Sequence, residues 1–202
     1  MVAQLFDDIL LRGVREGQIP ARTAGARDWY RQQAATVGKG DAAGEKLIRE
    51  AGKERYENRF RLGHMYMFAY DPKHKKTLPY YDRFPLIFPI NRAQGGFLGI
   101  NMHYLPPTLR AKLMDQLYTV ASNKKYDEST KLRISYDVLN GASKFKLFAP
   151  TVKHYLTKQV RTRLVYINPS EWDIALFLPT QKFVGAKQSK VWSDSRKAVR
   201  GR

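Results

Sequence analysis

The stretch Leu62-Gly-His-Met-Tyr-Met-Phe-Ala-Tyr70 decides the fold of this 202-residue chain. Its aromatic and apolar residues follow a period of two, which is typical of a β-strand. A turn-rich segment, Asp71-Pro-Lys-His-Lys-Lys76, ends this strand, and a second apolar run occupies residues 84–90. The sequence therefore predicts two strands joined by a polar connection.

Prolines and glycines shape the rest of the predicted sheet. Pro79, Pro85 and Pro89 each lack a backbone N–H, so we expect the second strand at a sheet edge or broken by a bulge. Gly95-Gly96 then precedes the apolar run Phe97–Leu105, the spacing of a hairpin. Because three antiparallel strands must curve strongly to enclose a core, the sequence predicts a small bent antiparallel sheet or an SH3-like open barrel.

Helical patterns come before this sheet. An apolar repeat near residues 5–10 predicts a first helix, and a second is expected over about 23–37. The charged segment 45–60 has a helical composition but a poor apolar stripe, so we expect it to be solvated or bound to a partner. These segments form a predicted N-terminal helical arm, residues 1–60.

Helical patterns also follow the sheet. Pro106-Pro107-Thr108 predicts a helix start, and that helix is expected to reach about Ala121. Asp127 is a candidate cap for a second helix that ends near Gly141.

Pro150 is expected to open a third helix in this part of the chain. Val152, Leu156 and Val160 would face inward at helical spacing. The cationic side chains Lys153, Lys158 and Arg161 would then lie on the outer face.

The final part of the core returns to the sheet and ends in a helix. Leu164–Ile167 is a short strand-like run, and Asn168-Pro169-Ser170-Glu171 combines the cap, first-turn proline and acid of a helix start. Pro179 ends that helix. The predicted class is α+β, with a core domain at 61–180 that packs the sheet against several helices.

The charge of the chain points to an acidic partner. It carries 36 Lys and Arg against 18 Asp and Glu, a formal net charge of +18. Self-repulsion of this size opposes compaction, so the charge favours a role in binding nucleic acid, an anionic membrane or an acidic protein. No run approaches the roughly 18 apolar residues of a membrane span, and no secretory signal starts the chain, so we expect a soluble protein made in the cytoplasm.

The basic tail, residues 181–202, concentrates this charge. It holds seven Lys or Arg against one acid, Asp194, and few side chains that could be buried. Such a segment gains its structure from a partner, so we expect the tail to become ordered on assembly.

Candidate nucleic-acid-binding residues come from the tail, the polar connection and the predicted third helix. Lys neutralises phosphates, and the neighbouring Tyr80 and Tyr81 could stack on bases or pack under their loop. The candidates are Lys73, Lys75, Lys76, Arg83, Lys153, Lys158, Arg161, Lys182, Lys187, Lys190, Arg196 and Lys197.

Signals for catalysis are weak. The chain has no Cys, and its four histidines have no metal-site spacing; we interpret His64 and His103 as sheet residues satisfied by hydrogen bonds. The alternative is a Mg²⁺-dependent nuclease built on Asp71-Pro72-Lys73 with Glu54 or Glu57. An Asp-Pro pair followed by basic residues is more often a solvated turn, so the sequence predicts no catalytic residue, metal or cofactor.

Three blocks of sequence resemble a known group of proteins. They are Tyr70–Lys73 with Leu78–Leu86, Gly99–Pro106, and Glu171–Pro179, and they span roughly residues 62–180. The chain is similar here to proteins encoded by contractile-tailed bacteriophages of the T-even-like kind. The resemblance implies a virion or morphogenesis component that meets genome ends or the neck or tail channel, and it implies no catalytic residues.

Charge and resemblance together predict a non-enzymatic phage structural or morphogenesis protein of the tail, baseplate, neck or completed head. We expect it in the virion, assembled in the host cytoplasm, where it binds DNA without sequence preference or neighbouring virion proteins through basic surfaces. Two alternatives stay open: an assembly component that contacts only proteins, and the nuclease described above.

Overall fold

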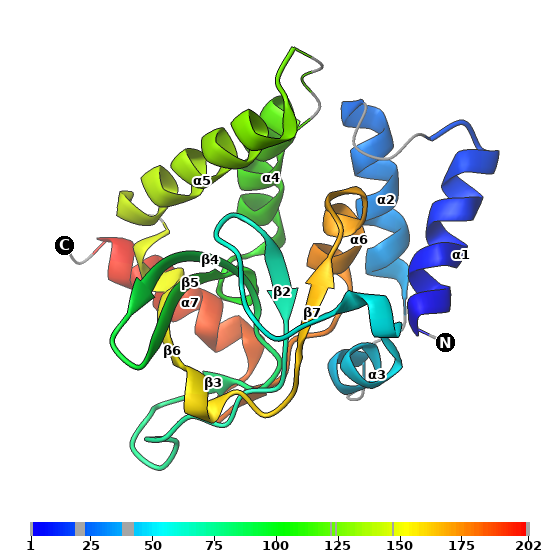
Figure 1. Ribbon diagram of the computed structural model, residues 1–202. Helices are drawn as coiled ribbons and strands as arrows, with labels where there is room; N and C mark the ends of the chain where they lie inside the picture. The colour runs from blue at the N-terminus through cyan, green and yellow to red at the C-terminus, as the bar shows by residue number, and fades with distance from the viewer. Residues whose placement is uncertain are drawn as a thin grey trace.

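A computed structural model describes residues 2–18, 23–37, 43–121, 123, 125–146 and 148–200 (Figure 1). The helices are α1 (Val2–Arg15), α2 (Ala24–Thr36), α3 (Ala43–Glu50), α4 (Pro107–Ala121), α5 (Glu128–Lys144), α6 (Trp172–Phe177) and α7 (Gln188–Arg200). The strands are β1 (Tyr56–Glu57), β2 (Met65–Met67), β3 (Tyr81–Asp82), β4 (Leu86–Ala93), β5 (Gly96–Asn101), β6 (Val152–Leu156), β7 (Leu164–Ile167) and β8 (Phe183–Val184). The 3₁₀ turns are η1 (Lys53–Arg55), η2 (Met102–Tyr104), η3 (Ala149–Thr151), η4 (Thr157–Gln159) and η5 (Pro169–Glu171).

A six-stranded sheet in the order β1-β7-β2-β4-β5-β6 forms the centre, and every neighbouring pair in it is antiparallel. The predicted meander is β2-β4-β5, with the hairpin turn at Gly95, whose φ is +71°. The sheet is bent but not closed: beyond β2 and β6, Tyr70 and Val160 form one isolated antiparallel bridge. The α+β class is confirmed.

Alternation along the strands explains why the sheet has an apolar core on both faces. In β2, Met65 and Met67 belong to one buried cluster, whereas Tyr66 belongs to a second cluster on the other face. In β4, Phe88 and Ile87 divide in the same way. Successive side chains of a strand point to opposite faces, so a strand buried on both sides is a continuous apolar run.

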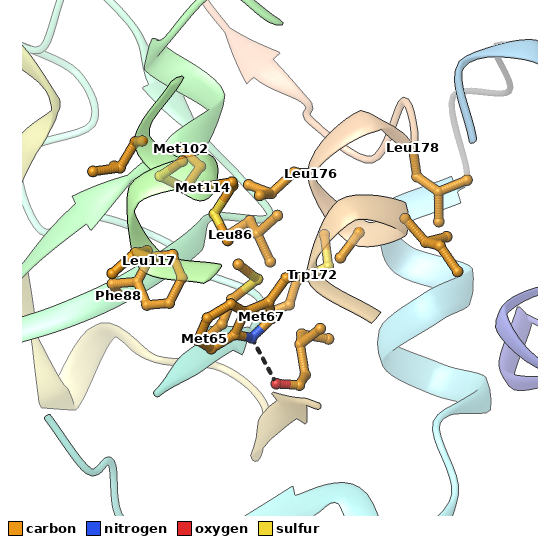
Figure 2. Close-up of a cluster of buried hydrophobic side chains, with 14 of the residues drawn as sticks. Met65, Met67, Leu86, Phe88, Met102, Met114, Leu117, Trp172, Leu176 and Leu178 are labelled. Carbon is orange, nitrogen blue, oxygen red and sulfur yellow. Dashed lines mark hydrogen bonds between the residues drawn. The ribbon is translucent and has the colours of Figure 1, made fainter. Parts of the chain in front are cut away.

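The larger cluster lies between the sheet and the helices (Figure 2). Trp172 of α6 stands over Phe88 with their rings 5.1 Å apart, and its indole N–H donates to the Ile167 carbonyl at 3.2 Å. Leu117 and Met114 of α4 pack into the same space. The smaller cluster lies on the other face of the sheet and is mainly aromatic, with Phe68, Phe97 and Tyr155 in mutual ring contact.

Local start signals place α5 and the start of α6 as predicted. Asp127 caps α5 by accepting from the Thr130 N–H at 2.7 Å. Asn168 and Glu171 form a capping box at η5, directly before α6. The Arg55 guanidinium makes two parallel bonds of 2.6 and 2.7 Å to the carboxylate of Glu171, which joins η1 to η5.

The first three helices contribute to the same buried cluster as the sheet. Phe6, Tyr30 and Leu47 are each 3 % exposed or less within it, and Figure 1 shows α1, α2 and α6 side by side. The segment 45–60 differs from our expectation: its first part is α3, which buries Leu47 and Ile48, and its end is η1 and β1. The proposed division at residues 60 and 180 stays a prediction.

The second strand is not at an edge. β4 lies between β2 and β5, and the expected bulge occurs where the register shifts between Pro89 and Asn91. The bulge places the missing N–H of the proline where the ladder is already interrupted.

The helix expected after Pro150 is wrong. Residues 152–156 form β6, an edge strand paired with β5 from Gly96 to Ile100. Without β6, the backbone N–H and C=O groups along one edge of β5 would be unpaired. Pairing with this edge outweighs the helical spacing of Val152, Leu156 and Val160. Lys153 consequently does not lie on a wet helix face: its ammonium sits 4.3 Å from the centre of the Tyr104 ring.

The basic tail is also not an unstructured appendage over its described part, 181–200. β8 pairs with β3, and α7 buries Val191 completely. The Trp192 indole donates to the His103 carbonyl at 2.9 Å. A few well-spaced apolar side chains thus hold a segment whose composition is dominated by charge.

A buried polar group holds these C-terminal elements to the sheet. The Asp82 carboxylate accepts from His103 Nδ1 at 2.7 Å and from the Asn101 amide at 3.0 Å. His103 Nε2 lies 3.2 Å from the Thr180 hydroxyl, so this histidine is satisfied as expected, although in η2 and not in a strand. His64 differs, because its buried Nδ1 has no hydrogen-bond partner among the described residues.

We expect Arg55→Met to destabilise the fold by about 3 kcal/mol, because Glu171 is buried and would lose its paired charge. Urea unfolding at pH 7.5 measures the change. Arg59→Met is the matched control, since that arginine is exposed and has no ion pair among the described residues. Equal midpoints for the two variants would contradict this assignment.

Burial lowers the pKa of His103, so the folded state favours its neutral form. In the unfolded chain this histidine takes up a proton near pH 6.5, whereas in the folded chain it stays neutral to lower pH. The free energy of unfolding should therefore be highest above pH 6.5 and fall as the pH is lowered. Urea unfolding between pH 7.5 and 5 should show this fall, with a smaller slope in His103→Gln.

Exposed His74 supplies the control, because His74→Gln should keep the wild-type slope. Burial also lowers the pKa of His64, so part of the slope should persist in His103→Gln. If the free energy of unfolding fell equally steeply with pH in His103→Gln and in His74→Gln, His103 would not be the group responsible.

Candidate nucleic-acid interface

Residues 161–163 form a short ridge between η4 and β7. The Arg161 N–H donates to the Ala69 carbonyl at 2.8 Å, and the Thr162 hydroxyl accepts from the Ala69 N–H at 3.0 Å. These bonds fix the ridge to the chain that continues from β2. Arg161 and Arg163 are both exposed, so the ridge carries two guanidinium groups at the rim of the sheet.

A cleft lies on each side of the ridge, and both clefts are lined by all three ridge residues. The first, named here the α3 cleft, has a volume of about 870 Å³ and is bounded by α3, β1, the start of the polar connection and β3. The second, the β5 cleft, has a volume of about 780 Å³ and is bounded by residues 57–60 and the β4–β5 hairpin. Clefts of this size can hold most of a ligand as large as a drug-sized molecule.

Cationic side chains outnumber carboxylates around the two clefts. The cations are Arg49, Arg59, Lys75, Arg83, Arg92, Arg161 and Arg163, and the carboxylates are Glu45, Glu57 and Asp71. This surplus creates a positive potential on one rim of the molecule, where a polyanion can reach it.

The ion pairs around the two clefts neutralise part of this charge, and Arg49, for example, lies 3.5 Å from Glu50. Asp71 accepts from Lys75 at 2.9 Å and from Arg161 at 3.3 Å, and the bond to Lys75, followed by that to Arg161, lowers the pKa of the carboxyl group. Arg163 donates only to neutral acceptors in the described chain, Asn58 Oδ1 at 3.2 Å and the Tyr56 carbonyl at 3.0 Å. Within the described ranges, Arg83 has no carboxylate in ion-pair contact and lies over the Phe84 ring at 5.6 Å.

Aromatic side chains line both clefts between the cations. The Arg163 guanidinium stacks over the Tyr56 ring at 5.2 Å in the α3 cleft, which Tyr81 also lines. In the β5 cleft the Phe60 and Phe97 rings are 4.5 Å apart. Alternating cations and aromatic faces are the chemistry with which proteins bind a phosphate backbone and stack on its bases.

Three of the predicted binding residues, Lys75, Arg83 and Arg161, converge on the α3 cleft. Lys73 and Lys76 are exposed in the same connection as Lys75, and Lys158 is exposed in η4. Lys153 is separate: it lines a smaller cavity beside Tyr80 and Tyr104, and burial lowers its pKa.

The cations of the tail lie elsewhere. Lys187, Lys190, Arg196 and Lys197 are exposed on or next to α7, which contacts η2 and η3. Lys190 is paired with Asp194 at 3.0 Å. Lys182 is half-buried, and its backbone carbonyl accepts from the Arg83 N–H at 2.8 Å.

Four cleft arginines were absent from our predicted set: Arg49, Arg59, Arg92 and Arg163. Arg49 and Arg59 belong to the charged segment 45–60, where intervening glutamates concealed the local surplus. Arg92 lies at the end of β4. The alternation of Arg161 and Arg163 was the available signal, because residues two apart on an extended chain share a face.

The nuclease alternative gains no support from this geometry. Asp71 is engaged by two cations, and Glu57 lines the other cleft, where it accepts from the Tyr66 hydroxyl at 2.7 Å. In the part of the chain that the structure describes, no three His, Asp or Glu side chains gather to hold a metal ion. The absence of enzymatic activity stays a prediction.

We expect Asp71→Asn to strengthen binding to a generic polyanion, because the change frees Lys75 and Arg161 from their shared carboxylate. The NaCl concentration needed to elute the protein from heparin measures the effect. Asp71→Asn should elute later than wild type and Asp194→Asn, on α7, should elute nearly with it. The opposite order would place the polyanion surface on α7.

Comparison with known proteins gives one match. The model of a family described as phage T4 terminal DNA protecting protein matches residues 24–197. No curated protein and no solved structure matches the chain. Over the described residues, no helix is sufficiently long and apolar to cross a membrane.

Proposed function

The chain belongs to the family described as phage T4 terminal DNA protecting protein, and we propose that it binds the ends of phage DNA through the α3 and β5 clefts. The observation that carries the proposal is the set of seven cations against three carboxylates around one ridge. The match agrees with the resemblance to T-even-like phage proteins, and it covers the chain from α2 to residue 197 of α7, including both clefts.

Binding in the clefts relies on charge and not on base sequence. Guanidinium groups pair with phosphate oxygens through two parallel hydrogen bonds, and each neutralised phosphate releases condensed counterions. The half-buried rings of Tyr56, Tyr81 and Phe60 can stack on any base. Recognition of this kind suits a ligand that is defined by its end and not by its sequence.

A protein bound to the end of DNA protects that end by covering it. An exonuclease must reach the terminal nucleotide, and a protein that covers this nucleotide excludes it without any chemical step. A place in the virion, contacts with other virion proteins and the lack of catalytic activity belong to the same proposal. A tail or baseplate position does not, because the proposed ligand is the genome end.

The binding test compares one DNA sequence as a linear duplex and as a closed circle. The linear form should bind more tightly, and affinity should fall steeply between about 50 and 200 mM salt. In Arg161→Gln/Arg163→Gln, the slope of log affinity against log salt should decrease by about 2, one for each lost phosphate contact. Lys144→Gln, an exposed change on α5, is the control for general charge.

A digestion assay tests the protective role directly. Wild-type protein should slow exonuclease digestion of the linear duplex, and the double variant should lose this effect. Equal affinity for circle and linear DNA, or affinity insensitive to salt, would refute the proposal.

The tail must be tested by substitution and not by deletion. Removing residues 181–202 would also remove β8 and the buried Val191. Lys187→Gln/Lys197→Gln should retain most of the protection. Loss of protection in this variant alone would move the interface to α7.

A further inference from the structure

The α3 cleft draws its cations from separate parts of the chain. Arg49 comes from α3, Lys75 from the polar connection, Arg83 from the end of β3, and Arg161 and Arg163 from the ridge. Cations that approach a single cavity from several sides are arranged for one compact, highly charged group. A backbone that passes along a surface needs only a row of single contacts.

Two of the five cations of this cleft, Arg83 and Arg163, are held in place without a carboxylate partner among the described residues, whereas Lys75 and Arg161 share Asp71 and Arg49 lies 3.5 Å from Glu50. Arg163 is fixed by the Asn58 side chain, the Tyr56 carbonyl and the Tyr56 ring, none of which carries a charge. Arg83 contacts the Phe84 ring. An orienting environment that leaves the full charge on a guanidinium reduces the entropy lost when an anion binds.

The ends of DNA carry one group that the interior lacks. An internal phosphodiester has a single negative charge, whereas a terminal phosphomonoester has a second ionisation near pH 6 and three acceptor oxygens. Its charge at pH 7 is about −1.5 to −2. Several guanidiniums around one cavity match this group better than they match a diester.

We propose that the α3 cleft binds the terminal phosphomonoester of a DNA strand together with its first nucleotide. The inference rests on the proposed function and specifies how an end is distinguished from the rest of the duplex. The volume of about 870 Å³ exceeds what a phosphate needs. Tyr56 and Tyr81 line the remaining space, where they provide ring faces for the terminal sugar and base.

The two clefts then have different roles. The terminal phosphate lies in the α3 cleft, and the diester backbone behind it crosses the ridge into the β5 cleft. There Arg59 and Arg92 supply single phosphate contacts. The carboxylates of the α3 cleft do not prevent this arrangement, because Asp71 is already paired with Lys75 and Arg161.

The experiment uses DNA hairpins with one open blunt end and a fluorophore in the loop. The open end carries a 5′-phosphate, a 3′-phosphate or hydroxyls only, and the full-length protein is titrated at one salt concentration. A phosphorylated end should bind about tenfold more tightly than the hydroxyl end. The comparison of the 5′ and 3′ forms identifies the strand that enters the cleft.

A pH series separates the phosphomonoester from a general charge effect. The preference should shrink as the pH is lowered from 7.5 to 5.5, because the terminal phosphate takes up its second proton. The charged side chains that face it are Glu45 and Arg49 of α3, Asp71 and Lys75, Arg83, and the two ridge arginines. No histidine lines the cleft within the described chain.

Two matched arginine variants test the location. Arg83→Gln should lose the preference for phosphorylated ends, whereas Arg92→Gln should weaken all hairpins alike and keep it. Equal loss of preference in both variants would overturn the assignment to the α3 cleft. Tight binding of ends without any phosphate preference would overturn the inference and leave the proposed function standing, and equal binding of ends and closed circles would overturn both.

Discussion

The buried carboxylate of Asp82 is the group on which the basic rim of this protein depends. It accepts hydrogen bonds from Asn101 and His103 and from the backbone N–H groups of Phe84 and Lys182. These bonds tie β3 to η2 and to the start of β8. Arg83 follows Asp82 directly, so a fully enclosed acid fixes the backbone of a cation that faces solvent. A charge-dense surface is positioned here by a polar group that never reaches it.

Concentrated positive charge must be compatible with a compact chain, and the structure shows how the repulsion is limited. One carboxylate, Asp71, serves two cations, and Arg163 is oriented by uncharged acceptors and a ring. Several other arginines are used internally: Arg31 joins α2 to α4 and α6 through Asp115 and Asp173. The cationic side chains are therefore divided between structural ion pairs inside the protein and the exposed positions around the two clefts.

Much of the framework could be predicted because its signals are local. The period of two in β2, the Gly95 turn and the capping box at Asn168 each act within a few residues. β6 could not be predicted, because Val152, Leu156 and Val160 fit a helix and only the unpaired edge of β5 decides otherwise. The same limit applies to the clefts: Lys75, Arg83 and Arg161 were identified singly, but their convergence depends on the pairing of distant strands, and Arg49 and Arg59 were concealed among glutamates.

The isolated bridge between Tyr70 and Val160 joins the chain that continues from β2 to the chain between η4 and the ridge. Lys75 and Arg83 follow Tyr70 in the chain and the ridge arginines follow Val160. All four line the α3 cleft. An anion bound in the α3 cleft, as proposed, would link these two parts of the chain non-covalently. A ligand bound only by the native state stabilises that state by mass action. The proposed ligand would therefore also stabilise the folded protein.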